Sequence, residues 1–226
     1  MIVKAHHWQG TNLVGLQGEG RAGTPGGQLD GLVTECWEAL AAHGLGAGDV
    51  VFTRLWMRER AHADGIAEVR ERRLRGPARA ASSSFFSHGH FIGPGAVALE
   101  LLAFRAKNPA SRRLVDFSPA RRYAHYMVQD DWLFLSGMAE EADTMDGQFD
   151  KALAEVQAAL DREGANWGQV TEATLFLERG RADLDWLRRR FLGAAPVLPP
   201  RISFEYVDGL ASTPKHLEIE VIVSLA

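Results

Sequence analysis

The tetrapeptide Gly27-Gln28-Leu29-Asp30 recurs as Gly147-Gln148-Phe149-Asp150, a shift of 120 residues. The same shift pairs further landmarks in the same order: Gly44 with Gly164, Val50 with Val170, Leu55 with Leu175 and Glu100 with Glu220. A proline-arginine motif also recurs, as Pro77-Ala78-Arg79 and Pro199-Pro200-Arg201. Landmarks that repeat in order at nearly one spacing predict two tandem copies of one unit of about 120 residues.

Both copies show the same order of predicted elements. Apolar residues at helical spacing predict a helix from residue 29 to 40, ended by Gly44, and another from 149 to 160, ended by Gly164. The elements that follow are a strand (50–57 and 170–178), a charged helix (62–75 and 181–192) and two closing strands (79–86 with 97–104, and 201–207 with 217–225). With two short strands before the first helix, each copy is predicted to be a ββαβαββ unit of the α+β class, its helices packed on one face of a mixed sheet.

The predicted domain boundaries follow from a break in this periodicity. Lys107-Asn108-Pro109-Ala110-Ser111 and Ser118-Pro119 have the composition of a loop. The sequence therefore predicts a first domain at 1–106, a linker at 107–119 and a second domain at 120–226.

Composition excludes several classes of function. The net charge of −4 argues against a nucleic-acid-binding surface, and the arginine runs at 70–75 and 188–190 are interspersed with acids, as on a solvated helix face. No apolar run is long enough to span a bilayer, and Met1-Ile2-Val3-Lys4 does not begin a signal peptide, so no membrane contact and a cytoplasmic location are expected.

The cysteine and histidines also have plain interpretations. The single cysteine, Cys36, lies on an apolar helical face and is predicted to be a small core residue. His6-His7 and His88-Gly89-His90 lack the partners and spacing of zinc ligands. No metal site is therefore predicted.

The second copy, about 120–226, resembles the Rid (YjgF) family along its length. The matching motifs are Leu133-Phe134-Leu135-Ser136-Gly137, the helix after Gln148, Pro199-Pro200-Arg201 and Leu217-Glu218-Ile219-Glu220. The first copy resembles the family more weakly: it has Leu13-Val14-Gly15-Leu16-Gln17-Gly18 where Ser-Gly is expected, and Ala98 where the second copy has Glu218. The resemblance implies a tandem YjgF/chorismate-mutase-like fold and a homotrimer with sites between subunits.

The resemblance also implies an activity. Rid proteins hydrolyse reactive 2-imino and 2-enamino acids to 2-keto acids and ammonia without a cofactor, so a small carboxylate-bearing substrate is expected. Arg54-Leu55-Trp56 and Asn108-Pro109 resemble chorismatases, which also carry tandem Rid-like units. A hydrolase or lyase acting on chorismate or another carboxylated natural-product intermediate is therefore an alternative. A small-acid binding module that has lost catalysis is a second alternative.

Arg201 and Glu218 are the main candidate catalytic residues. A guanidinium matches a carboxylate with two parallel donors and stays charged, and the family uses this arginine to hold the substrate carboxylate. Strand alternation places Glu218 and Glu220 on one face, where the acids form either a site or a solvated face. The resemblance favours Glu218 as the acid/base or water-positioning residue, and Glu220 is expected to be solvated or structural.

Three further residues complete the predicted site. Ser136 precedes Gly137 at a strand end, where a ligand can approach the backbone closely, and no neighbouring His or Asp indicates a covalent nucleophile. Tyr123 and Ser203 are predicted to bind substrate because they lie near family site positions. The first copy is expected to be catalytically silent, with the role of Arg79 left open.

Overall fold

The structure, a computed structural model, describes the backbone of residues 4–7 and 12–226 and the side chains from residue 12 onward. The side chains of His6 and His7, considered above as metal ligands, therefore lie outside the described residues, as do Met1-Ile2-Val3. Contacts divide the chain into two compact units, Met1–Asp130 and Asp131–Ala226.

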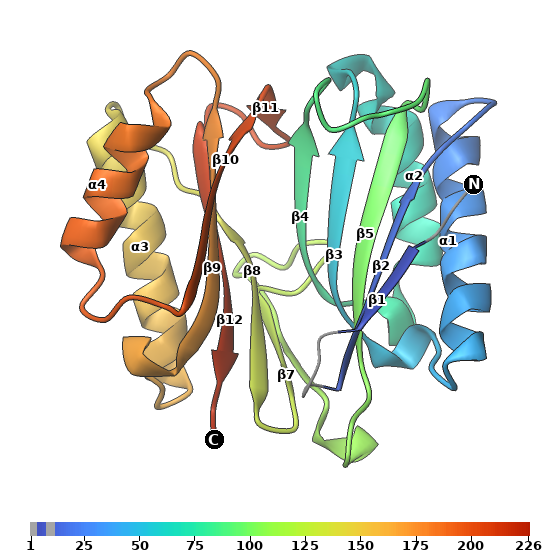
Figure 1. Cartoon of the computed structure of the whole chain (residues 1–226), viewed down its shortest axis with the longest axis horizontal. Helices are drawn as coiled ribbons and strands as arrows, with labels where there is room; N and C mark the ends of the chain where they lie inside the picture. Colours follow the sequence, from blue (N-terminus) through green and yellow to red (C-terminus); the bar gives the residue numbers. More distant parts are fainter. Residues whose placement is uncertain (1–3, 8–11) are drawn as a thin grey trace. The chain divides into compact units, whose positions relative to one another are not determined.

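The first unit is a mixed sheet with two helices on one face (Figure 1). Its elements in chain order are β1 (Lys4–His7), β2 (Leu13–Glu19), α1 (Pro25–Ala42), β3 (Val50–Met57), α2 (Ala63–Arg73), β4 (Ala81–Phe86) and β5 (Val97–Phe104), followed by β6 (Arg113–Val115) and β7 (Tyr126–Gln129). The strands lie in the order β1-β2-β5-β3-β4. Strands β3 and β4 are parallel, and the other neighbours are antiparallel.

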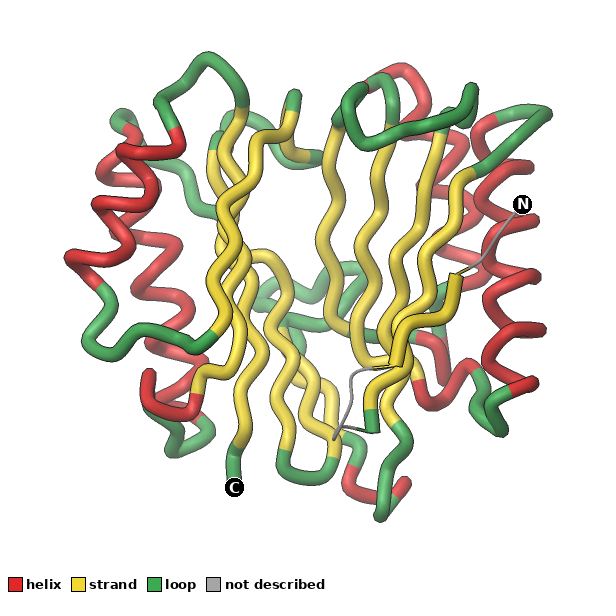
Figure 2. The backbone as a smooth tube through the Cα atoms, in the orientation of Figure 1, coloured by secondary structure: helices red, strands yellow, loops and turns green. Residues whose placement is uncertain are grey.

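The second unit repeats this arrangement, as the backbone trace in Figure 2 shows. Its elements are β8 (Trp132–Met138), α3 (Met145–Arg162), β9 (Val170–Glu178), α4 (Leu184–Ala194), β10 (Arg201–Val207), β11 (Gly209–Leu210) and β12 (Leu217–Ser224). The strands lie in the order β10-β9-β12-β8, with β9 and β10 parallel. The predicted α+β fold with helices on one face of a mixed sheet is therefore confirmed.

Several element boundaries differ from the prediction, and two of the differences have clear local reasons. Helix α4 begins at Leu184 rather than at residue 181, because the Asp183 side chain caps it by accepting a hydrogen bond from the Trp186 N–H. Strand β4 begins at Ala81 rather than at residue 79, because Gly76–Ala78 forms a 3-10 turn that the Arg79 N–H closes onto the Gly76 carbonyl.

The repeated tetrapeptide has a structural role in both copies. Thr24 and Thr144 cap α1 and α3 by accepting hydrogen bonds from the N–H groups of Gly27 and Gly147, at 3.2 and 3.0 Å. The Gln28 side chain then accepts the Ala96 N–H at 2.8 Å, and the Gln148 side chain accepts the His216 N–H at 2.8 Å. Each glutamine thus fastens the first helix of its copy to the loop before the last strand. The motif recurs because both copies need this tether.

Arginines of both runs form ion pairs between the two helices of their unit. Arg72 and Arg73 of α2 pair with Asp30 of α1 at 2.9 and 3.0 Å, and Arg190 of α4 pairs with Asp146 of α3 at 2.9 Å. Cys36 is fully buried, and burial raises the pKa of its thiol to about 12. It is therefore a core residue, as predicted, and an unreactive one.

The segment 107–119, predicted as a linker, is fastened to the first unit by Arg112. Its guanidinium donates to four backbone carbonyls, those of Gly48, Val50, Pro77 and Arg79, at 2.7–3.1 Å. Burial lowers the pKa of Arg112, although an arginine remains charged at neutral pH. The segment also contains the short strand β6, which pairs with β7.

Replacing Arg112 with lysine is expected to lower the free energy of unfolding by about 2–4 kcal/mol, because an ammonium group cannot satisfy four carbonyls at once. Urea unfolding measures the loss. Arg75→Ala is the matched control, because the Arg75 side chain is 63% exposed and forms an ion pair with Glu71 of α2; it should change stability by less than about 0.5 kcal/mol. Equal effects of the two substitutions would show that the hydrogen bonds from Arg112 to the four carbonyls do not contribute to stability.

Candidate functional site

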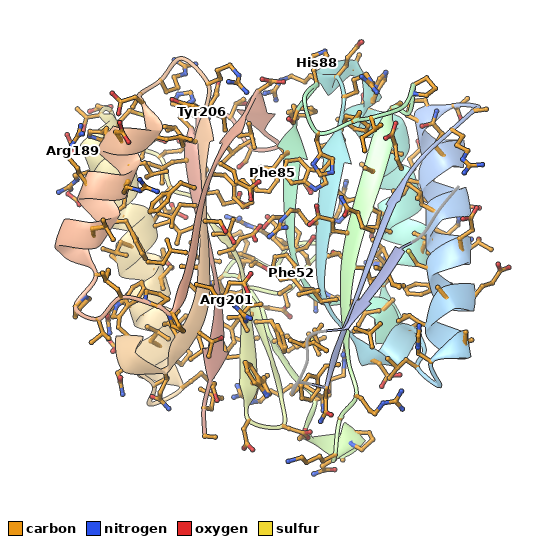
Figure 3. The ribbon with its side chains drawn as sticks, viewed as in Figure 1. Phe52, Phe85, His88, Arg189, Arg201 and Tyr206 are labelled. Carbon is orange, nitrogen blue, oxygen red and sulfur yellow. The ribbon has the colours of Figure 1, made fainter. Side chains whose placement is uncertain are left out.

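The predicted site residues of the second unit lie on the face of its sheet that faces away from α3 and α4, here called the helix-free face. Arg201 and Ser203 of β10 are exposed and pair in register with Glu172 and Thr174 of β9. Because side chains alternate along a strand, these four share a face. Figure 3 shows Arg201 on this side and Tyr206 on the side of α4, where the Tyr206 hydroxyl accepts the Leu184 N–H.

Glu218 and Glu220 lie on the same face, in β12. Their Cα partners on β9 are Phe176 and Thr174. The two acids are buried, with 7% and 5% of their surfaces exposed, so neither belongs to a solvated row. Burying a carboxyl group costs free energy unless polar groups surround it. A pair of buried acids on the flat surface of a sheet is therefore a specialised arrangement.

A β-bulge places Ser136 and Gly137 opposite Glu220. Met138 pairs with Ile219 and Leu135 pairs with Val221, so β8 holds one residue more than β12 across this stretch. The first copy has no such bulge: Leu16, Gln17 and Gly18 pair in unbroken register with Leu101, Glu100 and Leu99. The Ser-Gly motif, which the first copy lacks, therefore contains the extra residue that forms this bulge.

Gly137 makes the room that the Glu218 side chain occupies. A Cβ atom on Gly137 would lie 1.7 Å from Glu218 Oε1 and 2.0 Å from its Cδ. No other amino acid fits at position 137 while Glu218 holds this conformation. The bulge and the glycine together set the Glu218 carboxyl against the backbone of β8, beside the buried Ser136.

Replacing Gly137 with alanine is expected to displace the Glu218 carboxyl and to cost about 1–3 kcal/mol of stability through overpacking. Gly193→Ala is the control, since a Cβ atom there meets nothing within 4 Å. Thermal unfolding of Gly137→Ala, Glu218→Ala and the double variant measures the coupling. The alanine at 137 should cost much less when residue 218 is also alanine; an equal cost in both backgrounds would refute the contact.

Arg201 lies at some distance from Glu218 within the unit. In the strand register, Arg201 lies in one row with Glu172 of β9 and Ile222 of β12. Glu218 lies in another row, with Phe176 of β9 and Glu205 of β10. The two backbone positions are thus four residues apart along the strands, about 13 Å, and two strand spacings apart across the sheet, about 10 Å. The guanidinium is 52% exposed and held toward Glu172, with Nε 3.2 Å from Oε2. Within one unit, the candidate residues therefore form two separate groups, here called the Glu218 group and the Arg201 group.

Tyr123 and Arg79 belong by their contacts to the first unit. The Arg70 guanidinium lies 4.8 Å from the Tyr123 ring centre, and Phe117 packs edge-on against that ring. Arg79 pairs with Asp116 and donates to the Arg121 and Tyr123 carbonyls. In this structure, Arg79 fastens the segment before β7 rather than reaching toward a ligand.

A second polar cluster lies on the helix-free face of the first sheet, where no site was predicted. Glu100 of β5 accepts hydrogen bonds from Arg54 Nη1 at 2.5 Å and from Trp56 Nε1 at 3.0 Å. The ring of His90 stacks on Trp56, and its Nε2 lies 3.8 Å from Glu100 Oε1. Alternation in β3 puts Arg54 and Trp56 on one face, so the sequence signal was present, but the position of His90 depends on a loop that periodicity does not predict.

Neither a metal centre nor a membrane segment is found in the described part of the chain. Among these residues, no three His, Cys, Asp or Glu side chains gather as metal ligands. None of the described helices combines the length and apolar character needed to cross a bilayer.

No protein-family model matches the chain, and no curated protein matches it in sequence. Among solved structures, a chorismatase is 17% identical and matches over 98% of this chain and 80% of its own, with a TM-score of 0.69. A member of the YjgF/YER057c/UK114 family from Mycobacterium tuberculosis is 21% identical over 50% of this chain and 99% of its own, with a TM-score of 0.44. A YjgF family protein from Neisseria meningitidis is 22% identical over 51% and 95%, with a TM-score of 0.41. The chain therefore has the α+β fold of this chorismatase, which agrees with the fold class that the sequence predicted.

Proposed function

We propose that the protein hydrolyses a reactive 2-imino or 2-enamino acid to a 2-keto acid and ammonia, without a cofactor. The observation that carries the proposal is the Glu218 carboxyl, buried and set over Gly137 by a bulge that the first copy lacks. Glu218 takes a proton from water as the water oxygen bonds to the imine carbon. It returns that proton to the nitrogen to give the carbinolamine, then takes the carbinolamine hydroxyl proton and passes it to the nitrogen as the C–N bond breaks, so that one water is consumed and one ammonia is released.

Arg201 holds the substrate carboxylate in this proposal. Its guanidinium is exposed, and the weak ion pair to Glu172 can give way to a bidentate pair with substrate. Because Arg201 and Glu218 form separate groups within one unit, a small substrate that contacts both needs a second copy of this face from another chain. Ser136 and Ser203 flank the two groups, and Tyr123 remains a proposed substrate contact. The cytoplasmic location remains a prediction of the sequence.

A second candidate function is a hydrolase or lyase reaction on chorismate or another carboxylated intermediate. The specific observation in its favour is the similarity to a chorismatase over nearly the whole chain. This reaction also needs an anchored carboxylate and a buried acid. The test that separates the candidates is ammonia release from imines generated in situ by an amino-acid oxidase, with chorismate consumption measured in parallel. Turnover of neither substrate, together with binding of keto acids, would favour a non-catalytic binding module.

A homotrimer is the oligomeric state expected if sites form between chains. Light scattering at micromolar concentration should give three times the mass of one chain. Three-fold packing would bring the Arg201 group of one subunit to the Glu218 group of the next. A clean monomer under these conditions would remove the inter-subunit site from the proposal.

A further inference from the structure

His216 and Glu178 form a side-chain pair at the end of the second sheet where β9 finishes and β12 begins (Figure 1). His216 Nδ1 lies 2.6 Å from Glu178 Oε2, and the two side chains are 19% and 21% exposed. The Glu178 N–H also donates to the His216 carbonyl at 2.8 Å, so the two residues lie opposite each other on neighbouring strands. The pair is therefore ordered through both backbone and side chains while it stays accessible to solvent.

Strand alternation places this pair beside the Glu218 carboxyl on the helix-free face. His216 lies two residues before Glu218 along the chain, and Glu178 lies two residues after Phe176, the β9 partner of Glu218. Residues two apart in a strand share a face and lie about 7 Å apart. The imidazole is thus the next side chain to Glu218 along this face of β12.

The first copy builds the same backbone at this place without the side-chain pair. The Arg58 N–H donates to the Ala96 carbonyl at 2.9 Å, as the Glu178 N–H does to the His216 carbonyl. The glutamine of the repeated tetrapeptide accepts the N–H of Ala96 in one copy and of His216 in the other. The copy that has Ala98 in place of the buried acid therefore also lacks the pair, and the fold does not require it.

The Glu178 carboxylate determines which ring nitrogen of His216 carries the proton. A carboxylate only accepts hydrogen bonds, so Nδ1 donates to it, and Nε2 of the neutral ring is left as an acceptor. Arg181 Nη2 lies 3.5 Å from Oε1 of Glu178 and steadies the carboxylate from its other side. No residue that the structure describes forms a hydrogen bond with His216 Nε2. An oriented acceptor of this kind suits a ligand that presents an N–H.

We propose that His216 is a substrate-binding residue whose Nε2 accepts a hydrogen bond from the N–H of the 2-imino or 2-enamino acid. Glu178 is the positioning residue that sets the tautomer. This inference rests on the proposed deaminase function and adds a means of discrimination to it. The substrate nitrogen carries a hydrogen for Nε2, whereas the keto oxygen of the product can only accept and leaves Nε2 unpaired. No bond forms or breaks at His216, and Glu218 remains the group that moves the proton.

The test is calorimetric titration of the whole protein with oxamate and with pyruvate. Oxamate carries an NH2 group where pyruvate has a methyl group, so the two acids differ mainly in an N–H donor. The variant is His216→Ala, which should fold because the first copy has Ala96 at this place within the same backbone hydrogen bonds. Arg179→Ala is the matched control, because Arg179 follows Glu178 in the chain but is 61% exposed and pairs with Asp208. Thermal unfolding checks that both variants are folded.

Wild type should bind oxamate about three- to ten-fold more tightly than pyruvate, as expected for one additional hydrogen bond. His216→Ala should lose this preference and keep its affinity for pyruvate, whereas Arg179→Ala should keep the preference. In wild type, the imidazole nitrogen resonance of His216 should shift in NMR spectra with oxamate, a result that needs no substitution. Equal affinities for the two acids in wild type, an undiminished preference in His216→Ala, no shift at His216, or no binding of either acid would each overturn the proposal.

The ammonia assay tests the deaminase reaction separately, because binding of oxamate and pyruvate needs no turnover. A preference for oxamate that depends on His216, without ammonia release from any imine, would refute the deaminase reaction and leave His216 as a binding residue for an N–H group. Ammonia release by wild type without a preference for oxamate would refute the role of His216 alone.

Discussion

Glu218→Gln is expected to lower the rate of ammonia release by about 10²–10⁴-fold, the usual contribution of general acid–base catalysis. Glutamine keeps the size of the side chain and fits over Gly137, but it cannot take a proton from water. Affinity for a stable 2-keto acid should stay nearly unchanged, because the substitution leaves Arg201 intact. The ammonia assay and calorimetry with a panel of keto acids measure the two quantities.

Glu220→Gln is the matched control for this prediction. Glu220 lies two residues along the same strand, on the same face, and is buried to a similar extent. It should retain turnover close to that of wild type, with any effect confined to thermal stability. Normal turnover by Glu218→Gln would show that the acid is structural. Equal losses from both variants would indicate a general disturbance of the sheet face.

Arg201→Ala is expected to weaken keto-acid binding about ten- to a hundred-fold, because charge-assisted hydrogen bonds are worth roughly 1.5–3 kcal/mol. Its effect on stability should be small, since the guanidinium is half exposed and its ion pair to Glu172 is screened by solvent. Calorimetry reads the affinity, and urea unfolding reads the stability.

Two arginines serve as controls for Arg201. Arg179 is 61% exposed and pairs with Asp208 at 3.3 Å, and Arg179→Ala should bind keto acids normally. Arg79→Ala should lower stability, because Arg79 fastens Asp116 and two carbonyls, while affinity stays near that of wild type. If Arg79→Ala weakens binding as much as Arg201→Ala, the first copy contributes its arginine to the site.

The fold was predictable because its signals are local and occur twice. The threonine three residues before each tetrapeptide caps a helix, and the glutamine of the tetrapeptide fastens a loop; both tasks need particular side chains at fixed spacing. Strand limits such as Val50–Met57 follow from apolar runs that end at turns. The start of α4 was missed by three residues because the capping effect of Asp183 outweighed the charged pattern before it.

The site was less predictable because it depends on register. Alternation correctly indicates that Glu218 and Glu220 share a face. Their burial, the bulge at Ser136–Gly137 and the separation of Arg201 from Glu218 depend on strand pairing, which spacing alone does not reveal. The placement of His90 on Trp56 is likewise a property of a loop held by Glu19 and Arg58, whose roles have no local sequence signature.

The most direct test of the deaminase proposal is the rate of ammonia release by the wild-type protein from an imino acid generated in situ. An amino-acid oxidase supplies the imine, and the spontaneous rate in buffer is the reference. We expect the protein to raise the rate well above this reference and to do so in proportion to its concentration. A rate equal to the spontaneous one for every amino acid tested would contradict the proposed function.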